Sequence, residues 1–216
     1  MGCDIHGVWQ AKVNDKWVDV HSDYEGNRHY QLFAVLAGVR NGVGFAGNPT
    51  GDVVTPIDEP RGFPRDFPCA DDDSYKLEDP GTLSTWEQEM RARYPHENDD
   101  YYWLGDHSHS WLFADEMLQY YSKIPSVWHT GIISREEYEA WDGITAPNGY
   151  CRGIFRPKIE VADRTNGGGE ALPESVTHCQ IAWQADLKEE LAYFFDEVKR
   201  LKDEHGEVRF VFGFDS

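Results

Sequence analysis

Apolar and polar residues alternate at both ends of the chain, and this period of two is the pattern of half-buried β-strands. Residues 3–13 alternate in this way, and the segment "KWVDVH" (residues 16–21) follows a short turn as the returning strand of a hairpin. In residues 207–216 every second residue is apolar and bulky. We therefore expect a strand at each end of the chain, the last with four apolar side chains on one face: Val208, Phe210, Phe212 and Phe214.

A period near 3.6 residues marks two longer apolar helices. The first covers residues 28–42 and is expected to end at Asn41 and Gly42, and the second covers residues 185–206 and ends at Gly206. Shorter patterns predict helices at residues 84–94, 112–121 and 134–141 and strands at residues 127–133, 150–161 and 176–183.

Residues 42–83 break this regularity, because Gly, Pro and Asp dominate and the apolar periodicity disappears. Loops of this length inside a compact domain are usually functional. The patterns together predict a single α+β domain over residues 1–216. It would have a mostly antiparallel sheet, helices packed on one face, and residues 42–83 as a long loop-rich insertion.

The charge of the chain limits the kinds of molecule that it can bind. It carries 20 basic and 39 acidic residues, a formal net charge of -19, which argues against non-specific binding to nucleic acid or to an anionic membrane. The four cysteines are widely spaced, and no signal-peptide pattern or apolar stretch of membrane-spanning length occurs, so we expect a cytoplasmic protein with reduced thiols. N-myristoylation at Gly2 is not expected, because the acylation pattern requires Ser or Thr where His6 stands.

The first strand carries a candidate site. Asp4 and His6 are two residues apart, so both side chains leave the same face, roughly 6 to 7 Å apart along the backbone. This spacing suits two ligands of one metal ion, or a base and its orienting partner. The alternative is a pair of polar residues on an edge strand.

A second cluster lies in "GDHSHSW" (residues 105–111), where His107 and His109 accompany Asp106 just before an expected helix. Imidazoles beside a carboxylate are common metal ligands, although an exposed loop with capping serines explains the same residues. Asp215 would join Asp4 and His6 if the last strand pairs with the first; otherwise it is a polar end of the chain.

Arg40, Asn41 and Arg61 are the candidates for binding an anion. A guanidinium fork matches phosphate or carboxylate, and Arg61 lies in a segment stiffened by prolines. An arginine at a helix C-terminus can equally serve only to complement the helix dipole. The chain contains no nucleophile-elbow, P-loop or dinucleotide-binding motif.

Several short motifs occur in order from the first strand to the last: "MGCDIH", "YQLFAVLAGVRN", "PRGFP", "HSHSWL" and "VRFVFGFD". Together they resemble an uncharacterised family of small proteins encoded by tailed bacteriophages and prophages. The resemblance implies a viral accessory protein made in the bacterial cytoplasm, and it implies no activity.

The residue chemistry favours a metal-dependent hydrolase of a phosphoester, such as a nucleotide or a cyclic-nucleotide defence signal. Asp4, His6, His107 and His109 would hold a divalent metal ion (Zn, Mn or Mg), with Asp106 or Asp215 as partner, while Arg40, Asn41 and Arg61 bind the phosphate. The alternative is a non-catalytic counter-defence protein. It would sequester a nucleotide or engage a host defence protein by imitating DNA with its acidic surface.

Overall fold

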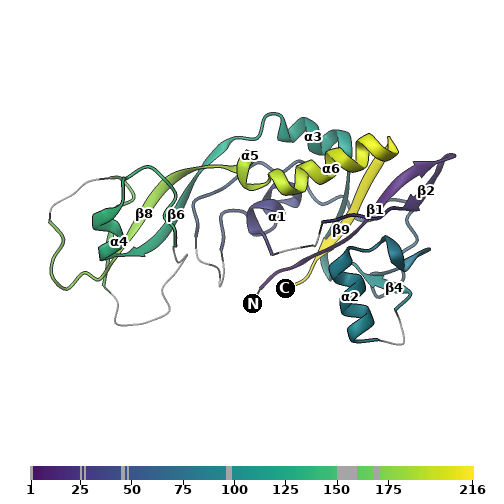
Figure 1. The fold of residues 1–216 in the computed structure, drawn as a ribbon, viewed down its shortest axis with the longest axis horizontal. Coiled ribbons are helices and arrows are strands. Elements are labelled where there is room, and N and C mark those ends of the chain that lie inside the picture. The colour runs from purple at the N-terminus through teal and green to yellow at the C-terminus, as the bar shows by residue number, and fades with distance from the viewer. Residues whose placement is uncertain are drawn as a thin grey trace.

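A four-stranded antiparallel sheet forms the main sheet of the protein and lies in the right-hand part of Figure 1. The computed structural model describes residues 2–24, 26, 28–44, 47, 49–95, 99–149, 160–167 and 171–216. The first and last strands pair along their length, as the alternation at both ends of the chain allows. In sheet order the strands are β2 (Lys16–Asp19), β1 (Ile5–Val13), β9 (Val208–Phe214) and β5 (His107–Phe113).

Helices cover one face of this sheet. Phe210, Phe212 and Phe214 point into the largest apolar core, together with the buried sides of the covering helices. This arrangement confirms the predicted α+β class. The helices on this face are α1 (Tyr30–Ala37), α3 (Ala114–Tyr121), α5 (Leu187–Glu190) and α6 (Ala192–His205).

One predicted helix end is wrong, and one predicted helix is divided, although its predicted end at Gly206 is confirmed. The first helix ends at Gly38 rather than at Asn41 and Gly42, because Gly38 adopts a left-handed conformation (φ 68°) and its N–H bonds the carbonyl of Ala34. The last helical segment is divided at Leu191 into α5 and α6.

The opposite face of the sheet is covered by the loop-rich segment and the short elements that follow it. Within residues 42–83, Phe67, Tyr75 and Leu77 form a second apolar core with Val8 and Val211 of the sheet. The segment is therefore mostly irregular but packed. The short elements on this side are β3 (Ser74–Lys76), a 3₁₀ helix (Pro80–Thr82), α2 (Thr85–Arg93) and β4 (Tyr101–Trp103).

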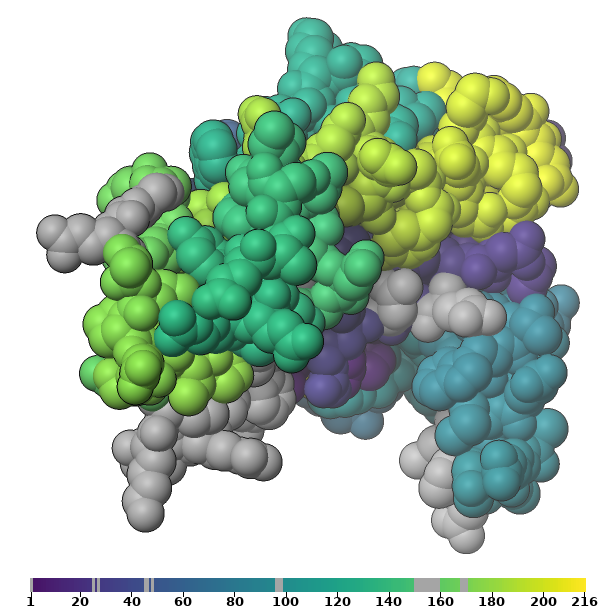
Figure 2. Space-filling model, turned by 60° about the vertical axis from the view of Figure 1, so that its left-hand side comes forward, coloured from purple at the N-terminus to yellow at the C-terminus, as the bar shows by residue number. Residues whose placement is uncertain are grey.

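A second, three-stranded sheet extends from the body, and we call it the arm (Figure 1). β8 pairs antiparallel with β6 over nine residues and parallel with the short β7. Figure 2 shows the side chains of the arm, in green and lime, gathered away from the blue segment that carries β3, α2 and β4. Most of the strand predicted at residues 150–161 lies outside the described residues. The elements of the arm are β6 (Ser126–Ser134), α4 (Arg135–Ala140), β7 (Val161–Asp163) and β8 (His178–Asp186).

A buried polar network joins the arm to the body. His129 of β6 is almost fully buried, with its Nδ1 3.2 Å from Asp52 Oδ2 and its Nε2 3.5 Å from Glu190 Oε1. Gln31 and Thr50 both donate hydrogen bonds to the same Asp52 carboxylate. Although burial by itself lowers the pKa of the His129 imidazole, the two carboxylates raise it to about 9.

Candidate functional site

The pairing of β1 with β9 brings His6 and Asp215 together. His6 lies directly across from Gly213, and its Nε2 is 3.2 Å from Asp215 Oδ2. The other oxygen of Asp215 accepts a hydrogen bond from the backbone N–H of Asp4 at 2.8 Å. The carboxylate is therefore held by the backbone on one side and orients the imidazole on the other.

Asp4 lies beside this pair, but its carboxylate faces Arg28. Arg28 donates from Nε to Asp4 Oδ1 at 2.7 Å and from Nη2 to Oδ2, a bidentate ion pair. The hydrogen bonds from Arg28 hold the pKa of Asp4 below its usual value. The predicted partnership of Asp4 and His6 thus becomes a partnership of His6 and Asp215, with Asp4 positioning Arg28.

An aromatic side chain borders the imidazole. The ring centroid of Trp103 is 5.0 Å from that of His6, and 42% of Trp103 is exposed. Tyr101 is equally exposed two residues earlier on β4, so both rings lie on the same face of that strand. The side chain of His6 is 25% exposed, and its Nδ1 makes no hydrogen bond within the described part of the chain.

A second arginine flanks the start of the chain. Arg40 adopts a left-handed backbone conformation (φ 56°), which is rare outside glycine, and its Nη2 donates to the carbonyl of Gly2 at 3.3 Å. Its guanidinium lies 5.6 Å from the centre of the Tyr30 ring. A Cβ on Gly2 would lie only 2.6 Å from the guanidinium carbon of Arg28, so both arginines reach the first residues. We name the following residues the rim site: Asp4, His6, Arg28, Arg40, Trp103 and Asp215.

The second histidine cluster does not join the rim site as a set of ligands. His107 and His109 belong to β5 and do not precede a helix directly, since α3 begins only at Ala114. A bulge at Ser108 (φ 51°) separates the two rings. His107 lies 6.1 Å from the Phe214 ring on the helix-covered face, whereas His109 packs against Gly213 on the other face.

His109 contacts the backbone of Leu104 and Gly105 where this segment crosses β9 at Gly213. Its Nε2 is 3.1 Å from the carbonyl oxygen of Gly105, and the neighbouring Leu104 carbonyl lies over Gly213. Asp106 is exposed, and its N–H bonds the carbonyl of Phe214. Within the ranges that the structure describes, no three His, Cys, Asp or Glu side chains gather closely enough to hold a metal ion. The predicted metal ligands therefore do not converge there.

Arg61 and Asn41 bind other parts of the protein. Arg61 forms a bidentate pair with Glu116 (2.7 and 3.0 Å) and a further ion pair with Asp58. The Asn41 side chain accepts from the N–H of Val54 and donates to its carbonyl. Both residues fasten the loop-rich segment to the body, a role that needs no ligand.

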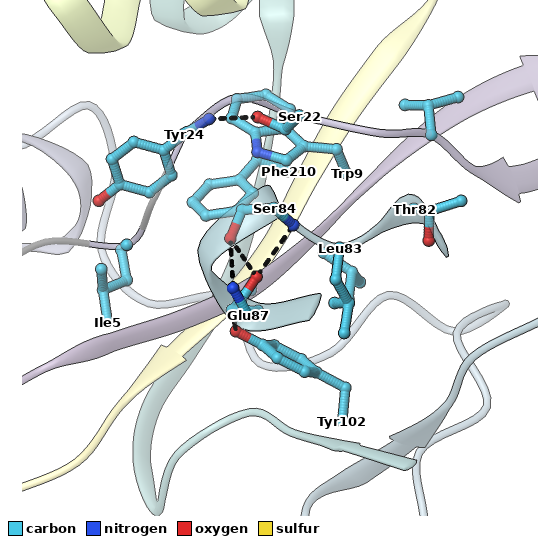
Figure 3. Close-up of a pocket in the computed structure, with 14 residues that line it drawn as sticks. Ile5, Trp9, Ser22, Tyr24, Thr82, Leu83, Ser84, Glu87, Tyr102 and Phe210 are labelled. Carbon is cyan, nitrogen blue, oxygen red and sulfur yellow. Dashed lines mark hydrogen bonds between the residues drawn. The ribbon is translucent and has the colours of Figure 1, made fainter. Parts of the chain in front are cut away.

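A small cavity lies beside α2 (Figure 3). Glu87 accepts hydrogen bonds from Ser84 and from the Tyr102 hydroxyl, and the buried Nε1 of Trp9 has no protein partner among the described residues. The cavity measures about 20 Å³, which holds an ordered water but not a nucleotide. The rim site is the better candidate.

Sequence reasoning missed Arg28 and Trp103. The alternation in "YYW" (residues 101–103) was a usable signal, because it places two aromatic rings on one face around a buried Tyr102. No sequence pattern pointed to Arg28, because it comes close to Asp4 only in the folded chain.

Comparison with protein-family models, curated proteins and solved structures finds no match to this chain. In the part of the chain that the structure describes, no helix combines the length and apolar character needed to cross a bilayer.

Proposed function

We propose that the protein is a hydrolase of a phosphoester, with a nucleotide as substrate and the His6–Asp215 pair as its acid–base group. The observation that carries the proposal is an imidazole oriented by a carboxylate at one nitrogen, in a side chain that is 25% exposed and whose other nitrogen makes no hydrogen bond to any residue that the structure describes. This is the arrangement that general base catalysis requires.

The proposed step needs no group from outside the chain except water. His6 accepts a proton from a water molecule as the water oxygen bonds to phosphorus. The bond between phosphorus and the ester oxygen breaks, and the leaving oxygen takes a proton from the imidazolium or from solvent. Asp215 stabilises the imidazolium while it exists.

The surroundings of His6 favour a nucleotide. Trp103 and Tyr101 offer exposed rings on which a base can stack. Arg28 and Arg40 flank the first residues of the chain, and we assign them to the phosphate because a chain with a net charge of -19 needs local positive charge to bind an anion. The ion pair of Arg28 with Asp4 keeps that guanidinium in place before the ligand arrives.

A divalent metal ion stays a prediction. His6 and Asp215 supply two donors, and the described residues add no third. The proposed step is written without a metal, and turnover with and without EDTA tests whether a metal ion takes part.

The second candidate is a counter-defence protein that sequesters a nucleotide without cleaving it. The exposed aromatic pair Tyr101 and Trp103, the latter beside His6, favours this alternative, because aromatic rings bind but do no chemistry. A role in phage-infected bacteria, made in the host cytoplasm, and imitation of DNA by the acidic surface remain proposals that rest on the motif resemblance and the charge.

The test is a panel of linear and cyclic nucleotides, followed for cleavage by chromatography and for binding by calorimetry. Cleavage that is lost in His6→Asn but kept in His205→Asn supports the hydrolase; His205 is the matched control because it ends α6, at the opposite end of β9. Binding without cleavage supports sequestration. Neither binding nor cleavage in the whole panel overturns both candidates.

A further inference from the structure

Within the residues that the structure describes, the central strand of the arm is paired along only part of one of its two hydrogen-bonding edges. β6 covers one side of β8 from His178 to Asp186, but β7 covers only His178 to Gln180 on the other side. The last bond on that side runs from the N–H of Arg164 to the carbonyl of Gln180, after which the chain turns away.

The direction of the backbone groups follows from this bond. Peptide groups alternate between the two edges of a strand, so those of Ala182 and Gln184 point to the same side as that of Gln180. No backbone bond from a described residue reaches Ala182 or Gln184 on this side. An unpaired edge of this kind is a template for an added strand.

A hollow of about 810 Å³ adjoins the edge, and Ala182 is part of its wall. Trp128, which pairs with Gln184 across the two strands and is 59% exposed, lines the hollow with Tyr138 and Trp141. The volume is in the range of ligand sites, and aromatic walls are typical of them. The hollow can therefore receive the side chains of a strand that is added to β8.

The charge around the hollow selects the partner. Among the described residues that line the hollow, Glu139 and Asp142 are acidic and Arg164 is basic, and the chain as a whole carries a net charge of -19. Exposed tryptophan also attracts cations through its ring face. A lysine- or arginine-bearing segment is therefore complementary to both the charge and the rings.

We infer that the arm binds an extended basic peptide segment of a partner protein. The segment pairs with β8 from Ala182 onward and places a cationic side chain against Trp128. Backbone pairing supplies affinity, and the aromatic hollow supplies specificity. This interaction surface is separate from the rim site.

The test uses a capped peptide of alternating lysine and valine, titrated into the intact protein and followed by calorimetry and tryptophan fluorescence. Three changes are expected to weaken binding by about tenfold or more: replacing lysine by glutamate, methylating alternate peptide nitrogens, and the substitution Trp128→Ala. Trp86→Ala is the matched control, because Trp86 is similarly exposed but belongs to α2.

The substitution Ala182→Pro tests whether the unpaired edge of β8 takes part in binding. Proline removes the N–H that points to the open side and leaves the pairing with β6 intact, whereas Ala182→Ser retains the N–H. Loss of binding in the proline variant but not in the serine variant supports the inference. If Ala182→Pro unfolds, the methylated peptide decides the same question without any substitution.

Three results would overturn the inference: no binding of the lysine peptide, equal binding of the methylated peptide, or a dimer of the protein that Trp128→Ala converts to a monomer. The last result would assign the edge to a second copy of this chain.

Discussion

His6 and Asp215 are separated by 209 positions in the chain, yet His6 Nε2 lies 3.2 Å from Asp215 Oδ2. The contact exists because β1 and β9 pair with His6 opposite Gly213, which carries Asp215 just past the start of β1. The rim site is thus built on the two most central strands of the main sheet.

The first prediction concerns this pair. Asp215→Asn keeps an oxygen that can accept from the N–H of Asp4 but removes the charge that stabilises the imidazolium. If the protein is a hydrolase, we expect turnover to fall by about 10²- to 10⁴-fold while nucleotide affinity changes little. Steady-state kinetics with calorimetry measures both. Equal loss of affinity and turnover, with an unchanged fold, would contradict the assignment of Asp215 to the acid–base group.

The second prediction concerns the backbone that crosses Gly213. A Cβ there would lie 2.1 Å from the Leu104 carbonyl oxygen and 2.4 Å from the His109 ring, so Gly213→Ala must displace the crossing segment. We expect a loss of about 3 kcal/mol in the free energy of unfolding, and weaker packing of Trp103 on His6. Urea denaturation measures the change in the free energy of unfolding. Gly149→Ala is the control, since a Cβ at Gly149 meets no atom within 4 Å.

The third prediction concerns pH. Because the folded-state pKa of His129 is raised to about 9 from an ordinary value of 6.5, protonation of His129 stabilises the fold fully below pH 6.5. This stability is lost as the pH rises from 6.5 through 9, and it amounts to about 3 kcal/mol. Urea denaturation at pH 6 and at pH 9.5 measures the change.

The control for this prediction is His129→Gln at the same two pH values. Burial raises the pKa of the Cys3 and Cys179 thiols, so they also lower stability at alkaline pH, but they do so equally in both proteins. An unchanged pH dependence in His129→Gln would contradict the role of His129.

The fourth prediction compares the roles of Arg61 and Arg40 in nucleotide binding. Arg61→Ala breaks a partly buried bidentate pair with Glu116 and is expected to cost about 1 kcal/mol of stability, with nucleotide affinity unchanged. Arg40→Ala is expected to weaken nucleotide binding by about tenfold. Thermal unfolding and calorimetry on the two variants decide the assignment. Weaker nucleotide binding in Arg61→Ala alone would restore Arg61 as the phosphate ligand.

Local periodicity was sufficient to predict most elements. The alternation of residues 3–13 and 207–216 and the apolar stripe of residues 185–206 correspond to β1, β9 and the α5–α6 segment. Each of these elements buries one face, and residues that are close in the sequence show this face as a repeating apolar pattern. The end of α1 at Gly38 was missed because both Gly38 and Gly42 can terminate a helix, and only the folded backbone selects one.

Part of the candidate site could also be predicted from the sequence, and part could not. The sequence by itself determined that Asp4 and His6 share a face of the first strand, because successive side chains of a strand alternate. Only the tertiary structure decided that Asp215 replaces Asp4 as the partner of His6, that Arg28 takes Asp4, and that the bulge at Ser108 sends His107 and His109 to opposite faces. These contacts join positions far apart in the chain, and their geometry is set by strand register and loop packing rather than by local pattern.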